Sequence, residues 1–172
     1  VSTESPEGLS LLGAKALLEL VAGYGGKARL RWPHDVTLRG RKLGGVLPVV
    51  RYSGNRLERA VLGVGLNVFS SPEHFTSELR AHLTTLALEC PVREWDVVEV
   101  ARRYLELLAL ELRFLENRGL AAFVERCQED LEGRGEQRIP VLVEPGKSPL
   151  VLAPIDKLDS DGALRLVDGS RL

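Results

Sequence analysis

RWPHDVTLRGRKLGGVLPVV, residues 31–50, decides the fold of this chain, because it predicts two β-strands joined by a tight turn at Arg39-Gly40. A second segment, LGVGLNV at residues 62–68, predicts a further strand in which small and apolar residues alternate. The two segments together predict a hairpin-rich sheet, and they carry most of the chemistry that the sequence offers.

The glycine-spaced strand has one nearly bare face. Successive side chains of a strand point to opposite faces, so Gly63, Gly65 and Asn67 share one face and the apolar residues between them face the core. Glycine inside a strand often marks a place where a ligand or another backbone approaches closely. This strand therefore predicts the wall of a cavity.

The hairpin contributes a cation and a carboxylate. Strict alternation places Gly44 and Val46 on the same face as Lys42, and Gly45 on the opposite face. Asp35 and Lys42 lie near the two ends of one short hairpin, so their side chains can meet across it. Glycines in strands also mark bulges, and an Asp/Lys pair beside a turn is usually a solvated ion pair. The pattern alone leaves a structural and a ligand-binding interpretation open.

Three motifs in this region resemble those of the biotin protein ligases. RWPHD, KLGGVL and GVGLN stand in the order and spacing of that family's KWPND segment, K-[LV]-[AG]-G-[IV]-L run and G-x-G-x-N strand. APIDKLDSDGALRLVDG, residues 153–169, is similar to the family's C-terminal small barrel. The resemblance covers most of the chain.

The resemblance implies a role for each residue of the site. Lys42 would contact biotin and stabilise the negative charge that develops as ATP activates a carboxylic acid. Asp35 would orient Lys42 or help to hold the Mg²⁺ that accompanies ATP. These two are the predicted catalytic residues, and the predicted substrate-binding residues are Trp32, Gly44, Gly45, Gly63, Gly65 and Asn67.

Some features depart from the family pattern. The family's asparagine before the aspartate is His34, and Pro48 follows the KLGGVL run and suggests an edge or bulged strand. The family's glycine/arginine-rich loop and its Ser/Thr/Asn segment do not precede Val1, and the chain has no methionine. We therefore expect a catalytic domain, residues 1–133, that is incomplete at its N-terminus, and a barrel, residues 134–172, that lacks a final strand.

The remaining pattern predicts an α+β fold with a mixed or antiparallel sheet packed against helices. The resemblance makes this a partial class II aminoacyl-tRNA synthetase/biotin synthetase-like fold, followed by an SH3-like β-barrel. Apolar periodicity predicts helices at residues 9–21, 76–88, 96–117 and 120–131. Strands are predicted at residues 27–32, 36–38, 42–52 and 59–69, with short strands from residue 139 onward.

Composition suits a globular enzyme domain. Of the 172 residues, 44% are hydrophobic and 27% are charged, and the net charge of −1 gives no electrostatic footprint for nucleic acid. Cys90 and Cys127 lack metal-like spacing, which favours reduced structural thiols. No signal peptide or membrane-length apolar run is present in the sequence, so we expect a cytoplasmic protein.

The leading functional hypothesis is an ATP-dependent biotin protein ligase. Such an enzyme would form biotinyl-AMP from biotin and ATP, and would transfer biotin to a lysine of a biotin carboxyl carrier protein, its partner. A homodimer is also compatible with the sequence, and neither a nucleic-acid nor a membrane partner is expected. Two alternatives stay open: a lipoate or octanoate transferase of the same fold, and a degenerate homologue that binds biotin or a protein without catalysis.

Overall fold

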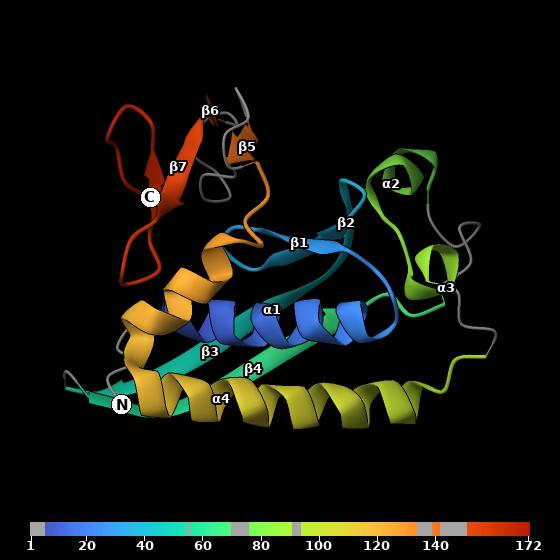
Figure 1. Cartoon of the computed structure of the whole chain (residues 1–172), viewed down its shortest axis with the longest axis horizontal. Helices are drawn as coiled ribbons and strands as arrows, with labels where there is room; N and C mark the ends of the chain where they lie inside the picture. The colour runs from blue at the N-terminus through green and yellow to red at the C-terminus, as the bar shows by residue number, and fades with distance from the viewer. Residues whose placement is uncertain (1–5, 55, 70–75, 91–93, 134–138, 142–150) are drawn as a thin grey trace.

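The computed structural model describes residues 6–54, 56–69, 76–90, 94–133, 139–141 and 151–172 (Figure 1). The helices and strands follow one another in the order α1 (Pro6–Gly23), β1 (Ala28–Arg31), β2 (Asp35–Leu38), β3 (Arg41–Ser53), β4 (Arg56–Leu66), α2 (Ser77–His82), α3 (Leu86–Glu89), α4 (Val97–Gln128), β5 (Ile139–Val141), β6 (Val151–Ala153), β7 (Ile155–Leu158) and β8 (Leu164–Leu166). The predicted α+β class is confirmed.

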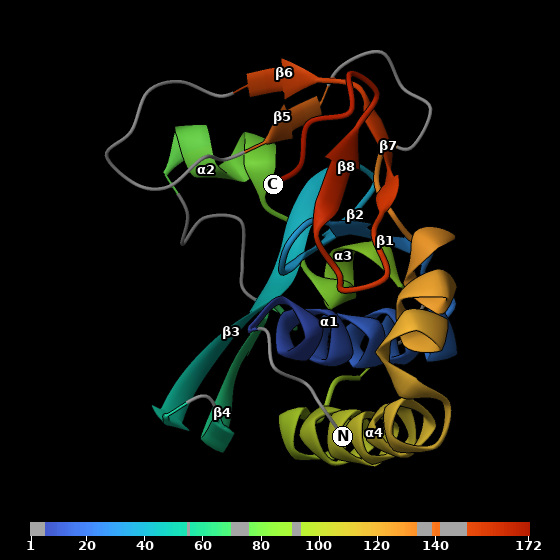
Figure 2. The same cartoon turned by 90° about the vertical axis from the view of Figure 1, so that its left-hand side faces the viewer.

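The main sheet is antiparallel, with the strand order β1-β2-β3-β4. Its four strands confirm those predicted between residues 27 and 69, and the Arg39-Gly40 turn joins β2 to β3 with positive φ at both residues. The β3–β4 pair is the longest and projects beyond the rest of the sheet as a two-stranded ribbon (Figure 2).

Helix α1 packs directly on the sheet, and α4 runs alongside α1 (Figures 1 and 2). Close contact occurs at Gly13, where an added Cβ would lie only 2.7 Å from Cγ1 of Val46 on β3. Leu11, Leu17 and Val21 of the same helix are completely buried. The core therefore lies between one face of the sheet and these helices, which leaves the other face of β3 and β4 to form the site.

Helix α4 contains a break that the sequence predicted. Gly119 has φ 79° and ψ 168°, a conformation outside the helical region, and it divides the span into two helical parts, as expected from the boundary between residues 117 and 120. Across the break, the Arg126 guanidinium pairs with both carboxylate oxygens of Glu111, at 2.9 and 3.2 Å, and stacks on the Phe114 ring. These contacts hold the second part of the helix against the first.

The single helix predicted over residues 76–88 is wrong. The chain forms two short helices, α2 and α3, with an extended connection at residues 83–85. The reason is a competing backbone partner, since the N–H of Thr84 donates to the carbonyl oxygen of Lys42, 2.9 Å away, instead of continuing a helix. Thr85 then caps α3 through its side chain.

The C-terminal part contains two small two-stranded sheets, β5-β6 and β7-β8. Gln128 of α4 fixes the second one, because its side-chain amide donates to the carbonyl oxygen of Leu158 and its Oε1 accepts from the N–H of Leu158. The described strands do not form an SH3-like barrel, so the barrel and the domain boundary at residue 133 stay predictions. Among the described residues no helix is long and apolar enough to cross a membrane.

Candidate functional site

A hollow of about 530 Å³ lies on the face of β3 and β4 that the helices leave uncovered. Seven of the eight predicted site residues line it: Asp35, Lys42, Gly44, Gly45, Gly63, Gly65 and Asn67. The sheet register brings these residues together, because β2 and β4 both pair with β3, one on each side. The eighth residue, Trp32, does not line this hollow.

The two charged residues of the hairpin form an ion pair. Lys42 Nζ lies 2.7 Å from Asp35 Oδ1, with 42% of the lysine side chain and 14% of the aspartate side chain exposed. His34 Nε2 lies 3.8 Å from the same carboxylate oxygen. The predicted meeting of ammonium and carboxylate across the hairpin is confirmed, and the lysine remains open to the hollow.

A β-bulge determines which way Lys42 points. Val36 pairs with Gly44 and Thr37 with Lys42, so Leu43 is an extra residue on β3. The bulge shifts the alternation by one residue, and both Leu43 and Val46 are buried in the core. The expectation that Lys42 shares a face with Val46 is therefore wrong.

Gly45, not Gly44, shares the face of Lys42. A Cβ on Gly45 would lie 3.7 Å from Cε of Lys42 and 2.8 Å from Asp35 Oδ1, so the ion pair lies directly over this glycine. Gly65 stands opposite Gly45 in the register, and an added Cβ there would meet nothing within 4 Å. The floor of the hollow is thus bare backbone beside a fixed cation, an arrangement that suits a flat or extended ligand carrying negative charge.

Comparison with known proteins agrees with this geometry. Residues 7–67 match the model of the biotin/lipoate A/B protein ligase family. The biotin--[acetyl-CoA-carboxylase] ligase of Mycobacterium tuberculosis is 35% identical over 112 residues, which cover 63% of this chain and 38% of that protein. Over these residues the chain is similar to biotin/lipoate A/B protein ligases.

Other relatives match a shorter part of the sequence. The bifunctional ligase/repressor BirA of Bacillus subtilis is 30% identical over 80 residues, 46% of this chain and 25% of that protein. The chain thus spans between a quarter and two fifths of the curated relatives it matches. The biotin protein ligase of Aquifex aeolicus superposes with a TM-score of 0.77 at 20% identity, covering 98% of this chain and 72% of that one, which establishes the shared fold.

Asn67 has a clear structural role beside the hollow. Its Nδ2 donates to the carbonyl oxygen of Thr84 at 3.2 Å. Its backbone N–H donates to the carbonyl oxygen of Leu43 at 2.9 Å. The amide predicted to face the cavity lies at its edge and holds the connection between α2 and α3. Its role in substrate binding stays a prediction.

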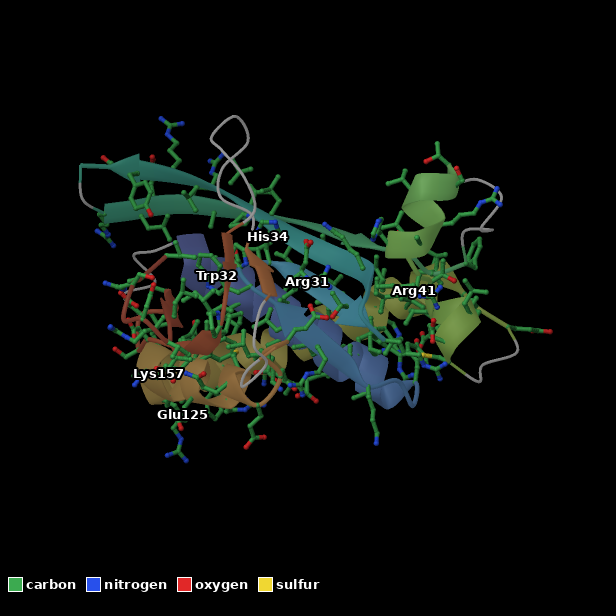
Figure 3. The ribbon with its side chains drawn as sticks, turned by 90° about the horizontal axis from the view of Figure 1, so that it is seen from above. Arg31, Trp32, His34, Arg41, Glu125 and Lys157 are labelled. Carbon is green, nitrogen blue, oxygen red and sulfur yellow. The ribbon has the colours of Figure 1, made fainter. Side chains whose placement is uncertain are left out.

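Trp32 connects the main sheet to the C-terminal hairpin. Its Nε1 donates to the carbonyl oxygen of Gly162, 2.9 Å away, in the turn between β7 and β8. Figure 3 shows Trp32 and His34 on the same short connection between β1 and β2. The predicted role of Trp32 in substrate binding also stays a prediction.

The sequence did not indicate one further group, the carboxylate of Glu89. It lies at the end of α3, with its side chain only 2% exposed, and forms ion pairs with Arg39 and Arg41 beside Lys42. No local motif identifies it, since its nearer arginine partner, Arg41, is 48 residues away in the sequence.

The two cysteines lie outside the hollow. Cys90 and Cys127 are free and buried, and burial raises the pKa of both thiols, that of Cys127 to about 12. In the part of the chain that the structure describes, no three His, Cys, Asp or Glu side chains form a cluster that could hold a metal ion. The side chains of His34, Asp35 and Lys42 line the hollow, together with glycine backbone.

Proposed function

We propose that this chain carries the acyl-adenylating part of a biotin protein ligase. The observation that supports the proposal most directly is the Lys42–Asp35 ion pair, 2.7 Å long, above a floor made of Gly45 and Gly65. The bare backbone would let the ring and acyl chain of biotin lie against the sheet, while the ammonium would face the carboxylate end.

In the first step, a carboxylate oxygen of biotin would attack the α-phosphorus of ATP. A P–O bond would form as the bond to pyrophosphate breaks, so that biotinyl-AMP and pyrophosphate are the products. Negative charge gathers on the α-phosphate and the incoming carboxylate in the transition state. A fixed ammonium at Lys42 would stabilise that charge without reorganisation, since Asp35 already holds the side chain.

Mg²⁺ would enter the site with ATP. Asp35 is the one carboxylate among the described residues that line the hollow, and it is already paired with Lys42. Because Mg²⁺ in nucleotide sites is held by one or two carboxylates together with substrate phosphates, this donor set fits an ion carried mainly by the triphosphate. Orientation of Lys42 is then the main role that we propose for Asp35.

In the second step, a lysine amine of a biotin carboxyl carrier protein would attack the acyl carbon of biotinyl-AMP. An amide bond would form, AMP would leave, and the proton of the amine would pass to solvent. The name of the Mycobacterium tuberculosis relative supports a carboxylase as the acceptor. The SH3-like barrel at residues 134–172, a homodimer and a cytoplasmic location belong to the same proposal.

Transfer of biotin by the full-length protein provides the test. The protein should transfer radiolabelled biotin to a carrier domain in the presence of ATP, and should not do so with lipoate or octanoate. Preference for lipoate or octanoate would favour the related transferase instead. Calorimetric binding of biotin without any transfer would favour the non-catalytic homologue.

A further inference from the structure

The buried carboxylate of Glu89 lies next to the Arg39-Gly40 turn and outside the hollow. Figure 3 shows Arg41 beside α3, the helix that ends in Glu89. Glu89 Oε2 lies 3.1 Å from Arg39 Nε, and Oε1 accepts hydrogen bonds from Arg41 and from Thr84 Oγ1, the latter at 2.8 Å. One side chain thus connects the turn, the start of β3 and the connection before α3.

These contacts converge on the backbone of Lys42. Arg41 precedes Lys42 in the sequence, and the N–H of Thr84 donates to the carbonyl oxygen of Lys42 at 2.9 Å. Glu89 therefore holds Lys42 in two ways: through its covalent neighbour, and through a residue hydrogen-bonded to its main chain. Thr84 is itself almost fully buried, at 1% exposure, which keeps water away from this connection.

The backbone at this point needs such support. Arg39 has φ 51°, a left-handed conformation that non-glycine residues seldom adopt because it is sterically strained. Lys42 also adjoins the bulge at Leu43, where the regular ladder is interrupted. The direction of the Lys42 side chain thus depends on a short segment between a strained turn and a bulge, and Glu89 binds both sides of that segment.

We infer that Glu89 is a positioning residue for Lys42, acting through Arg41 and Thr84. This inference rests on the proposed function, since Lys42 would serve the adenylation step. A buried charge that has good partners is costly to break, because removing it leaves the partner groups unsatisfied. The carboxylate of Glu89 contacts the side chains of Arg39, Arg41 and Thr84, although Glu89 does not itself line the hollow.

Amide exchange in the full-length protein tests the positioning itself. Glu89→Gln removes the charge, and Thr84→Val removes the hydroxyl donor while keeping its shape. Either substitution should make the backbone amide of residue 84 exchange at least about tenfold faster. Glu58→Gln is the matched control, since Glu58 pairs with Arg51 at 3.1 Å on the exposed ribbon, and it should leave that amide unchanged.

Adenylate formation tests the consequence for the reaction. Glu89→Gln should lower kcat about tenfold at saturating biotin and ATP, with KM for biotin within about twofold, because the lysine loses its direction while the glycine floor persists. Unchanged amide exchange at Thr84, or a kcat equal to that of Glu58→Gln, would overturn the inference. If the wild-type protein formed no adenylate, the proposed function would fail, and the amide-exchange result alone would decide the role of Glu89.

Discussion

Gly45 lies directly beneath the carboxylate of Asp35, so close that a Cβ added to the glycine would stand 2.8 Å from Asp35 Oδ1. The ion pair with Lys42 uses this same oxygen. The absence of a side chain at residue 45 is thus a condition for the charged pair, and it also bares the floor of the hollow. Gly65 faces Gly45 across β3 and β4 but has no such contact, since a Cβ added to Gly65 would meet nothing within 4 Å. The two glycines should therefore respond differently to substitution.

Gly45→Ala should displace the Asp35 carboxylate and break its contact with Lys42. We expect both adenylate formation and biotin affinity to fall by at least about tenfold, since the methyl group disturbs the cation and also covers the floor. Gly65→Ala has open space around its new Cβ, so thermal stability should stay unchanged while biotin affinity falls. Calorimetry with biotin and a melting curve separate these effects.

Gly23→Ala is the control for both glycine variants. Gly23 ends α1 away from the hollow, and an added Cβ there also meets nothing within 4 Å. It should change neither biotin binding nor the melting temperature appreciably. If Gly65→Ala bound biotin as tightly as Gly23→Ala does, the glycine floor would not be the ligand surface.

Lys42→Ala should separate catalysis from stability. The lysine is 42% exposed, so loss of its ion pair should cost no more than about 1 kcal/mol of unfolding free energy. Loss of a positioned charge in the transition state should lower adenylate formation about a hundredfold. Pyrophosphate exchange and urea unfolding measure the two quantities.

The exposed residue Lys27 supplies the comparison. Lys27→Ala should leave pyrophosphate exchange at the wild-type rate. Asp35→Asn should give an intermediate loss of pyrophosphate exchange, because Lys42 remains but is less well held. Equal rates for Lys42→Ala and Lys27→Ala would remove Lys42 from the mechanism.

The sequence predicted the hairpin and the lysine because these depend on local patterns. Alternation, glycine spacing and the Arg39-Gly40 turn are properties of adjacent residues, and the structure confirms the strands that they predict. The bulge at Leu43 was missed, because a single extra residue leaves no mark in a pattern that is apolar on both sides. One undetected bulge was enough to group Lys42 with Gly44 and Val46 instead of with Gly45.

Long-range contacts account for the other differences. Thr84 leaves the helical conformation because it finds a backbone partner at Lys42, and Glu89 is buried because Arg39 and Arg41 reach it from the sheet. Nothing near residues 84 or 89 in the sequence announces these partners. Tertiary contacts of this kind override helical periodicity, and only the folded chain shows them.

Trp32→Phe should show whether Trp32 acts as a structural link or as a ligand contact. The phenyl ring keeps most of the apolar surface but cannot donate to the carbonyl oxygen of Gly162, so the unfolding free energy should fall by about 1 kcal/mol. Amide exchange should become faster across β7 and β8, while biotin affinity stays at the wild-type value. A large loss of biotin affinity with unchanged exchange would instead support the predicted substrate contact.

Cys127 should make stability fall in alkaline solution. Burial raises the pKa of its thiol to about 12, whereas an unfolded thiol titrates near 8.5, so the folded state retains a proton that the unfolded state loses. The stabilising effect is complete below the unfolded pKa and disappears as pH rises toward the folded one. The unfolding free energy in urea should therefore decrease between about pH 9 and pH 12.

Cys127→Ala should be less stable at pH 7, because a buried sulfur is lost, but its stability should decline less steeply with pH. Tyr104, whose pKa burial also raises to about 12, keeps a residual slope in both proteins. Parallel curves for the wild type and Cys127→Ala would show that the thiol takes no part in the alkaline transition.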